Sequence, residues 1–214
     1  MKKNYTHLVV LLDRSGSMRT IQNDIKEGFK TFIDDQKKLD GECTLSLVQF
    51  DNEYEKTFDF KNIQDFSTDD FVFTPRGSTA LVESMTKLIE ETGKSLAGMS
   101  DENRPEKIIF LTITDGEENC SKYEYTSERL KKLVEEHTNI WKWEFSYIGA
   151  NQDSFAVAKS FGINLNSVMN YTASAAGTAN AFASVSANSV RYRSGASKSF
   201  NYTPEEQKLG DEIK

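Results

Sequence analysis

The sequence predicts an α/β fold in which a mostly parallel sheet carries helices on both faces. Short apolar runs of strand length alternate along the chain with longer segments whose apolar residues recur at helical spacing. The runs at residues 8–12 and 107–114 are also apolar almost without interruption, which is typical of central strands covered on both sides. In such sheets, ligands collect beyond the carboxyl ends of the strands, where the strand order reverses.

The first half of the chain contains three predicted strands and two predicted helices. Residues 8–12 form the first strand, and a helix follows because apolar side chains recur at helical steps. The members of that stripe are Ile21, Ile25, Phe29, Phe32 and Leu39. Residues 43–50 and 54–60 are predicted to be strands joined by a hairpin turn, which makes the second of them antiparallel. After an irregular polar segment, a second helix begins near Thr79 and ends at Gly98.

The second half repeats the alternation of strands and helices. Residues 107–114 form a strand, and Leu130, Leu133 and Val134 mark a third helix. The alternation from Trp141 to Tyr147 predicts a strand with one face less deeply covered. The last predicted elements are a short helix at 153–161, a strand at 168–171 and a small-residue helix at 174–192. We interpret residues 1–194 as a single domain and the polar residues 195–214 as a loosely held tail.

Composition limits the classes of partner. The chain has 214 residues, of which 28% are charged, and its net charge is -7, which argues against binding to a nucleic-acid backbone. No stretch approaches the roughly 18 apolar residues of a membrane span. The apolar run near the start is shorter than the roughly 7–15 residues of a signal-peptide core. Cys43 and Cys120 have no metal-site or disulfide-framework spacing. We therefore expect a cytoplasmic protein that binds neither nucleic acid nor membranes.

Polar side chains gather where two buried strands end and one helix begins. Asp13 terminates the first strand, and Ser15 and Ser17 follow at alternate positions. Thr79 lies at the start of the second helix, and Asp115 terminates the strand at 107–114. This set of oxygen donors suits magnesium, manganese or calcium better than zinc. If the two strands are neighbours, burying both carboxylates without a cation is costly.

Each of these segments also has an ordinary structural explanation. Ser15 and Ser17 can cap the helix that follows them, and this role is compatible with metal binding. Asp115 and Gly116 can form a simple turn, although a carboxylate at the end of so apolar a strand is more than a turn requires. Because hydroxyl and carboxylate groups occur at all three places, we favour the metal site.

Other polar residues of these loops are interpreted more simply. Three acidic residues, Asp51, Glu117 and Glu118, could form a second cation site or a solvated charged loop. We favour the solvated loop. Arg14 is expected to point outward, where it is a surface residue or a partner contact. Tyr123 and Tyr125 either line the binding face or are ordinary loop residues. His7 and His137 are interpreted as structural.

The three polar segments together resemble the metal-ion-dependent adhesion site of von Willebrand factor A (vWA) domains, the family that includes the integrin inserted domains. "DRSGSM" matches the family's DxSxS motif, "GST" supplies its threonine, and "TDGE" supplies its second aspartate, in the family's order. The resemblance extends over roughly residues 5–190. It implies a doubly wound, Rossmann-like sheet with one antiparallel edge strand. It also implies a divalent metal held by five residues: Asp13, Ser15, Ser17, Thr79 and Asp115.

The resemblance implies protein binding as the function. In the family the serines coordinate the metal directly, the threonine directly or through water, and the aspartates often through water. A metal held mainly by neutral hydroxyls keeps an open position that favours an acidic residue of a partner protein. We therefore expect Mg²⁺, with Mn²⁺ or Ca²⁺ as alternatives, and a partner that presents Glu or Asp. Stand-alone domains of this family occur in bacteria and in their viruses.

Two other functions remain open at this point. The first is an intracellular assembly scaffold in which the metal is mainly structural. The second is a metal-dependent phosphatase, since an aspartate at the end of a first strand is also typical of haloacid-dehalogenase-type enzymes. Those enzymes need a second aspartate two residues later as general acid, and here that position is Ser15. The chain also lacks the GxSxG and GxxxxGK[ST] motifs. We therefore expect that the protein is not an enzyme.

Overall fold

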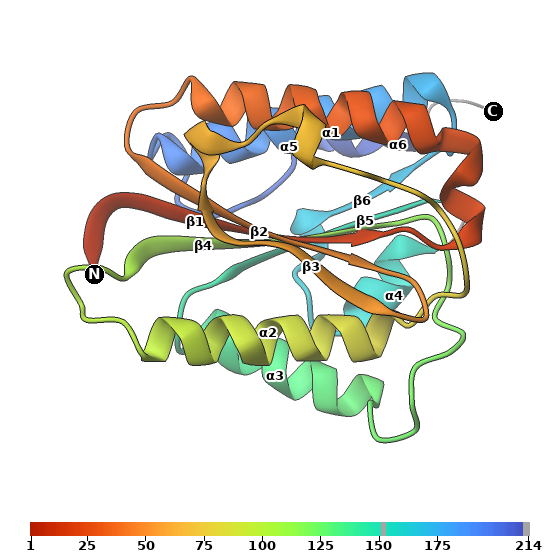
Figure 1. The fold of residues 1–214 in the computed structure, drawn as a ribbon, viewed down its shortest axis with the longest axis horizontal. Coiled ribbons are helices and arrows are strands. Elements are labelled where there is room, and N and C mark those ends of the chain that lie inside the picture. The colour runs from red at the N-terminus through yellow and green to blue at the C-terminus, as the bar shows by residue number, and fades with distance from the viewer. Residues whose placement is uncertain (151–152, 212–214) are drawn as a thin grey trace.

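A six-stranded sheet forms the middle layer of the protein (Figure 1). The computed structural model describes residues 1–150 and 153–211. The strands, in their order across the sheet, are β3 (Tyr54–Asn62), β2 (Glu42–Phe50), β1 (Lys2–Asp13), β4 (Pro105–Thr114), β5 (Glu144–Ala150) and β6 (Val168–Tyr171). Neighbouring strands are parallel except for β2 and β3, which form the hairpin. The predicted fold, a mostly parallel sheet with one antiparallel edge strand, is confirmed.

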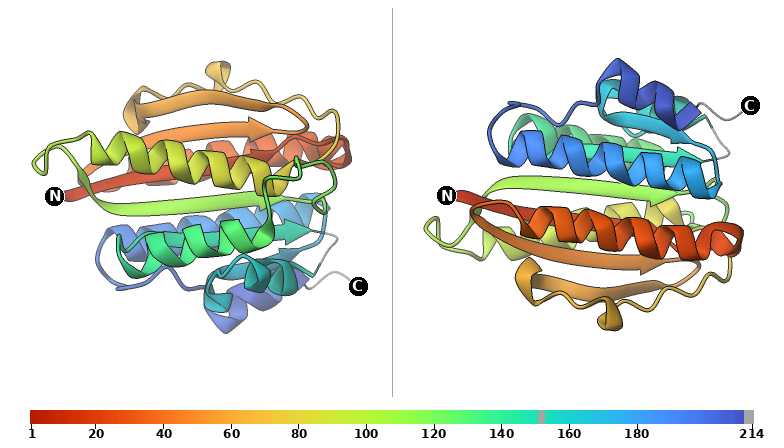
Figure 2. Two further views of the ribbon diagram at one scale, coloured as in Figure 1. Left: turned by 90° about the horizontal axis from the view of Figure 1, so that it is seen from below. Right: turned by 90° about the horizontal axis from the view of Figure 1, so that it is seen from above.

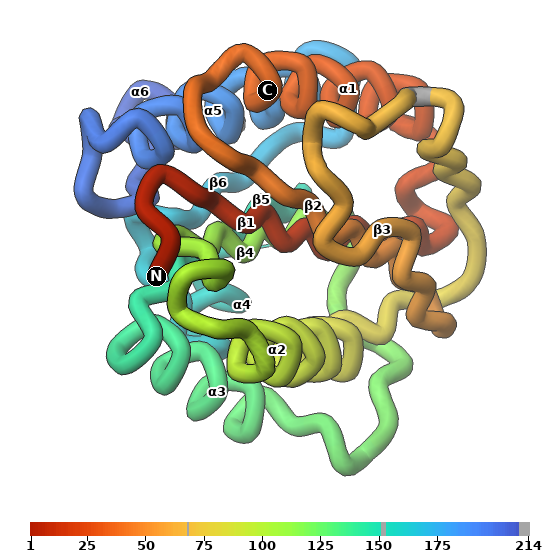
Figure 3. Tube along the Cα trace, turned by 60° about the vertical axis from the view of Figure 1, so that its left-hand side comes forward, coloured from red at the N-terminus to blue at the C-terminus, as the bar shows by residue number. Residues whose placement is uncertain are grey.

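Helices cover both faces of this sheet (Figures 2 and 3). One face carries α1 (Gln22–Lys37), α5 (Ala175–Arg193) and α6 (Pro204–Asp211). The opposite face carries α2 (Leu81–Ala97), α3 (Ser127–Asn139) and α4 (Ser154–Ser160). Short 3₁₀ segments lie at Gly16–Ile21, Ile63–Asp65, Thr68–Asp70 and Leu165–Ser167. None of the helices in the described part of the chain has the length and apolar character needed to cross a membrane.

The two faces explain why β1 is apolar without interruption. Leu8, Val10 and Leu12 belong to the core cluster beneath α1 and α5, whereas Val9 and Leu11 belong to the cluster beneath α2 and α3. All five residues are buried. Burying one such side chain contributes about 1.5–3 kcal/mol, so both layers of helices are held by this central strand.

The strand order creates the switch point at which a ligand site is expected. The chain leaves β1 through α1 to reach β2 on one side, whereas β4 lies on the other side of β1. Leu12 of β1 pairs with Ile113 of β4, so both strands end at the same level. The segments that follow β1 and β4, and the segment that precedes α2, all lie at this edge, on the right-hand side of Figure 1. Asp13, Thr79 and Asp115 are therefore brought to one place.

The C-terminal segment differs from the loosely held tail that the sequence predicts for residues 195–214. Phe200 is fully buried and Tyr202 is 5% exposed, and residues 204–211 form α6. The Tyr202 hydroxyl lies 2.8 Å from Ser146 Oγ on β5, and the Phe200 N–H donates to Glu144 of the same strand. The part of the predicted tail at residues 212–214 lies outside the described residues.

The same packing explains a second difference, at β5. The alternation of residues 141–147 predicts one less deeply covered face, but β5 begins at Glu144 and its residues from Phe145 to Ala150 are all buried. Trp141 lies before the strand and is 58% exposed. The polar face of β5 is covered because the segment around Tyr202 folds over it. The polar residues that alternate along β5 therefore form hydrogen bonds with the C-terminal segment and are not exposed to solvent.

Candidate metal centre

Asp13 connects the ends of β1 and β4. Its side chain has no exposure to solvent, and both carboxylate oxygens accept short hydrogen bonds. Oδ1 accepts from the N–H of Ser15 at 2.6 Å, and Oδ2 accepts from Thr114 Oγ1 at 2.6 Å. The carboxylate thus fixes the turn after its own strand and the last residue of the neighbouring strand.

A chain of hydroxyl and carboxylate groups continues from this turn. Ser15 Oγ lies 3.0 Å from Ser17 Oγ, and Ser17 Oγ donates to Asp115 Oδ1 at 2.6 Å. Ser15 and Asp115 are 2% and 4% exposed, so the cluster is almost closed to solvent on these sides. No side-chain capping bond is made by Ser15 at the 3₁₀ segment that follows it, where it holds the N-cap position. The capping explanation for Ser15 therefore finds no support in the hydrogen bonds.

Thr79 joins the same cluster from the start of α2. A Cβ built on Gly116 would lie 3.0 Å from Thr79 Oγ1, 3.5 Å from Ser17 Oγ and 3.7 Å from Ser15 Oγ. Three hydroxyls from two separate loops thus converge on the space beside a residue that has no side chain. The structure brings together all five residues that the sequence predicts as metal ligands. Their donor set of two carboxylates and three hydroxyls fits a hard divalent cation.

The two carboxylates are in an environment that disfavours their charge. Burial, together with the nearby Asp115, raises the pKa of the Asp13 carboxyl to about 7, although hydrogen bonds from Thr114 and Ser15 oppose this shift. Burial also raises the pKa of Asp115 above its ordinary value, against the opposing hydrogen bond from Ser17. A divalent cation would stabilise both carboxylates in the charged form, because it supplies the opposite charge that the surrounding protein does not.

Arg14 lies inside the protein, which corrects the expectation that it points outward. It is 6% exposed, and its Nε donates to Asp51 Oδ2 at 2.9 Å. Asp51 is itself fully buried, which corrects its interpretation as part of a solvated loop. Arg76 Nε donates to the same oxygen of Asp51 at 3.0 Å. The remaining oxygen of Asp51 accepts from the N–H of Glu53. Asp51 therefore holds the loop after β1 and the segment before Thr79 against the β2–β3 turn.

Glu118 and Ser121 cap the helix that begins after Thr79. The residue at the N-cap position of α2 is Ala80, which has no side chain for capping. The N–H of Val82 donates to Glu118 Oε2 at 2.7 Å, and the N–H of Glu83 donates to Ser121 Oγ at 2.9 Å. This capping role corrects the interpretation of Glu118 as part of a solvated charged loop. The available signal was a helix start without a capping residue of its own.

The other residues singled out in the sequence lie in different surroundings. Tyr123 is 94% exposed, whereas the ring of Tyr125 contacts the cationic side chains of Lys87 and Arg129, at 5.6 Å and 5.3 Å from its centroid. His7 is buried in the core, where its Nδ1 lies 2.8 Å from Thr44 Oγ1. The two cysteines, Cys43 and Cys120, are free; the first is buried and the second is exposed.

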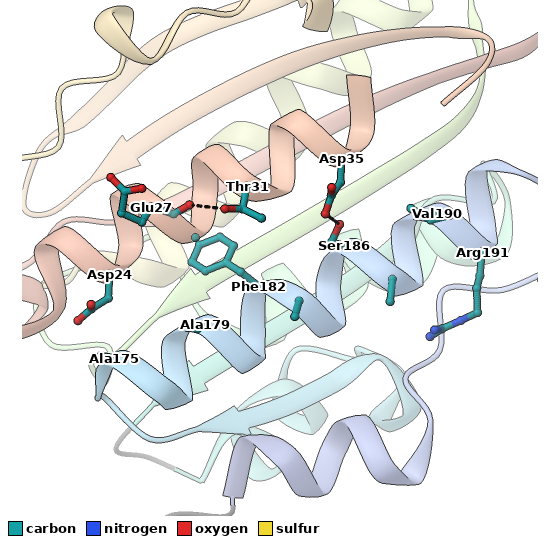
Figure 4. A pocket seen from close by; sticks show the side chains of 13 residues that line it. Asp24, Glu27, Thr31, Asp35, Ala175, Ala179, Phe182, Ser186, Val190 and Arg191 are labelled. Atoms are coloured by element: carbon teal, nitrogen blue, oxygen red, sulfur yellow. Dashed lines mark hydrogen bonds between the residues drawn. The ribbon is translucent and has the colours of Figure 1, made fainter. Parts of the chain in front are cut away.

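A groove of about 580 Å³ lies away from this cluster, between α1 and α5 (Figure 4). Phe182 of α5 points toward α1, where a Cβ on Gly28 would lie 2.2 Å from its ring. Alanines of α5 line one side of the groove, and Asp24 and Glu27 of α1 line the other. None of the five candidate metal ligands lines this groove.

Comparison with solved structures shows the fold. Proximal thread matrix protein 1 from the mussel byssus superposes with a TM-score of 0.64 at 18% identity, covering 83% of this chain and 46% of that protein. Another structure of that protein is described as having a zinc-occupied MIDAS motif (TM-score 0.64, 18% identity, covering 84% of this chain and 46% of that one). A von Willebrand factor type A protein from Catenulispora acidiphila gives a TM-score of 0.63 at 16% identity, covering 86% and 42%. The chain thus spans less than half the length of these proteins.

Comparison of the sequence with family models gives a match along most of the chain. The model of the von Willebrand factor type A domain matches residues 7–192, a range that contains β1, β4, α2 and all five candidate ligands. A search among curated protein sequences gives no match. The family match agrees with the strand order and with the residues gathered at the carboxyl ends of β1 and β4. This chain therefore belongs to the von Willebrand factor type A domain family.

Proposed function

We propose that this protein is a divalent-metal-dependent protein-binding module and not an enzyme. The observation that carries the proposal is the convergence of Ser15, Ser17 and Thr79 on the space beside Gly116, with Asp115 bonded to Ser17 and Asp13 just behind. Ser15, Ser17, Thr79 and the two aspartates would hold the cation, and Mg²⁺ is the ion we expect. When bound, the cation supplies an open coordination position for an acidic side chain of a partner protein.

The residues around the cluster support positioning more than proton transfer. Asp13 is fixed by two hydrogen bonds, and Ser15, at the position where a phosphatase of the type considered would need an acid, is bonded to Ser17. Arg14 is also unavailable for a partner, since Asp51 and Glu55 bind it. We therefore propose that the metal centre is a rigid binding site for a carboxylate of a partner protein. The cytoplasm is the location that we propose for this binding.

The experiment is affinity capture from a lysate of the native host, with Mg²⁺ and with EDTA, followed by mass spectrometry. Capture by the wild-type protein is expected with Mg²⁺ and not with EDTA. Gly116→Ala retains all five candidate ligands but places a methyl group 3.0 Å from Thr79 Oγ1, so we expect it to reduce capture at least tenfold. Gly98→Ala is the matched control, because its Cβ meets nothing closer than 3.5 Å.

The outcomes separate the proposed functions. Capture of the same partner in EDTA, by the wild type and by Gly116→Ala, would exclude the metal bridge and favour an assembly scaffold. Capture that is lost in EDTA and in Gly116→Ala, but kept in Gly98→Ala, would support the metal-dependent module. Circular dichroism of each variant shows whether a loss of capture reflects a loss of folding.

A further inference from the structure

Thr79 is a candidate ligand whose main chain is held by a residue outside the predicted site. The N–H of Thr79 donates to Asn119 Oδ1 at 2.9 Å, and the N–H of Asn119 donates to the carbonyl of Thr79 at 3.0 Å. A single residue of the β4–α3 loop thus binds both main-chain polar groups of Thr79. The next N–H along the chain, that of Ala80, donates to the carbonyl of Asp51 at 3.0 Å, on the side of the β2–β3 turn.

These contacts matter because α2 has no side-chain cap at its start, although the N–H of Ser84 donates to the carbonyl of Ala80 at 3.0 Å. Ala80 occupies the N-cap position without a side-chain cap, and its φ and ψ of -94° and 61° are not helical. The orientation of Thr79 therefore depends on neighbouring loops. Its hydroxyl lies in the candidate metal centre, 3.0 Å from the position of a Gly116 Cβ. A small rotation of this main chain would move the hydroxyl out of the cluster.

We propose that Asn119 is a positioning residue that holds Thr79 as a metal ligand. The inference rests on the proposed function, since it requires that the cluster binds a divalent cation. Asn119 lies four residues after Asp115, so the same loop that carries one ligand also sets the orientation of another. The Asn119 side chain thereby connects the loop that carries Asp115 to the start of α2, which carries Thr79.

The amide oxygen of Asn119 is the part that a substitution can remove selectively. Asn119→Ala abolishes the acceptor for the Thr79 N–H but leaves the Asn119 N–H in place. Asn119 is itself exposed, so its truncation is not expected to unfold the protein. Cys120→Ala is a matched control in the same loop, because Cys120 is also exposed and contributes its main-chain N–H to Glu118.

The experiment measures Mn²⁺ affinity by isothermal titration calorimetry in four proteins and the control. We expect Asn119→Ala to raise the Kd about three- to tenfold, since it removes one hydrogen bond that orients a ligand. Cys120→Ala is expected to leave the Kd within about twofold of the wild type. Thr79→Val removes the hydroxyl and keeps the branched shape. In the Thr79→Val background, Asn119→Ala is expected to change the Kd by less than about twofold, because Asn119 then has no ligand to orient.

A second readout needs no metal. Amide hydrogen exchange of the metal-free protein, followed by NMR, is expected to accelerate at Thr79 in Asn119→Ala and to remain unchanged at Val82, which Glu118 binds separately. An equal loss of Mn²⁺ affinity in both backgrounds, or an unchanged Kd in Asn119→Ala, would overturn the positioning role while the proposed function stands. A wild-type protein that binds no Mn²⁺ would overturn the proposed function and this inference together.

Discussion

Asp13 is a residue whose charge is costly in the metal-free protein. Burial raises the pKa of this carboxyl to about 7, so the folded state favours the protonated form between the ordinary pKa of 3.8 and 7. In that range the folded state binds more protons than the unfolded state, and the free energy of unfolding falls as the pH rises. Retaining a charged Asp13 at neutral pH is therefore a cost in stability that a bound cation would offset.

We therefore expect Asp13→Asn to stabilise the metal-free protein and to abolish metal binding. The amide oxygen can still accept from the Ser15 N–H, and the amide nitrogen can donate to Thr114 Oγ1 after that hydroxyl turns. In EDTA at pH 8 the variant should be more stable by about 1–3 kcal/mol, and the difference should disappear near pH 4. Urea denaturation at several pH values measures this difference.

Asp40→Asn is the control for this change, since Asp40 is exposed and its substitution should alter the free energy of unfolding by less than about 0.5 kcal/mol. Adding Mg²⁺ should stabilise the wild type and leave Asp13→Asn unchanged. A variant that is less stable than the wild type at pH 8 in EDTA would show that burial does not disfavour the Asp13 charge as described.

At the same scale, the sequence locates the candidate ligands but not the residues that hold them. Asp13, Ser15 and Asp115 are recognisable because carboxylates and hydroxyls interrupt apolar runs at strand ends. Arg14 and Asp51 carry no such signal, because their burial depends on a contact between residues 37 positions apart. A charged residue in a polar loop is usually solvated, so only the folded chain reveals that these two form an internal pair.

Helix α2 is an element whose first turn is completed by another loop. Glu118 accepts hydrogen bonds from the N–H groups of Val82, Cys120 and Ser121 and from the Ser121 hydroxyl. A helix start leaves N–H groups without partners in the helix, and a carboxylate there also interacts favourably with the helix dipole. The stability of α2 therefore depends on the loop that follows Asp115.

We expect Glu118→Ala to lower the free energy of unfolding by about 1–2 kcal/mol. Hydrogen exchange at the Val82 amide should also accelerate, because this N–H loses its partner. Glu117→Ala is the matched control, since the neighbouring carboxylate is exposed. Equal stability losses in the two variants, measured by urea denaturation, would contradict the assigned capping role and indicate a general effect of charge in the loop.

At the scale of elements, the periodic segments were predictable and the irregular ones were not. Helices such as α1 and α2 follow directly from apolar residues at helical spacing. Residues 195–203 form neither a helix nor a strand, yet Phe200 and Tyr202 within them are buried. Isolated aromatic residues in a polar segment give no periodic signal. In the folded protein these residues cover the polar face of β5, where the Tyr202 hydroxyl contacts Ser146. This contact between distant segments cannot be predicted from the local sequence.

For the whole molecule, the alternation of strands and helices was enough to predict an α/β fold with a mostly parallel sheet, and the resemblance to vWA domains implied that the sheet is doubly wound. The continuous apolar runs identified β1 and β4 as central strands, and the hairpin at Asp51 placed β3 antiparallel to β2. The position of the ligand site followed from the general rule for such sheets. The order of β4, β5 and β6 across the sheet was not predictable from periodicity, because a periodic pattern identifies a strand but not its neighbours in the sheet.

The acid stability of the whole molecule should depend on His7, which lies in the central strand β1. Its ring is fully buried, stacks on Phe60 with a centroid distance of 3.8 Å, and contacts Thr44 Oγ1. Burial lowers the pKa of this imidazole from its ordinary 6.5 to about 3. Because the imidazole has no exposure to solvent in the folded protein, we infer that it gains a proton mainly when the molecule unfolds.

The direction of the effect follows from the proton balance. Between pH 6.5 and about 3 the unfolded state binds a proton at His7 and the folded state does not, so the free energy of unfolding falls as the pH falls. His7→Phe keeps the stacked ring and removes the titration. Relative to this variant, the wild type should lose about 2–3 kcal/mol between pH 6.5 and pH 4.5 in urea denaturation. Parallel profiles of the wild type and His7→Phe would mean that the folded protein accommodates a charged His7, and that β1 is less completely closed to solvent than its burial indicates.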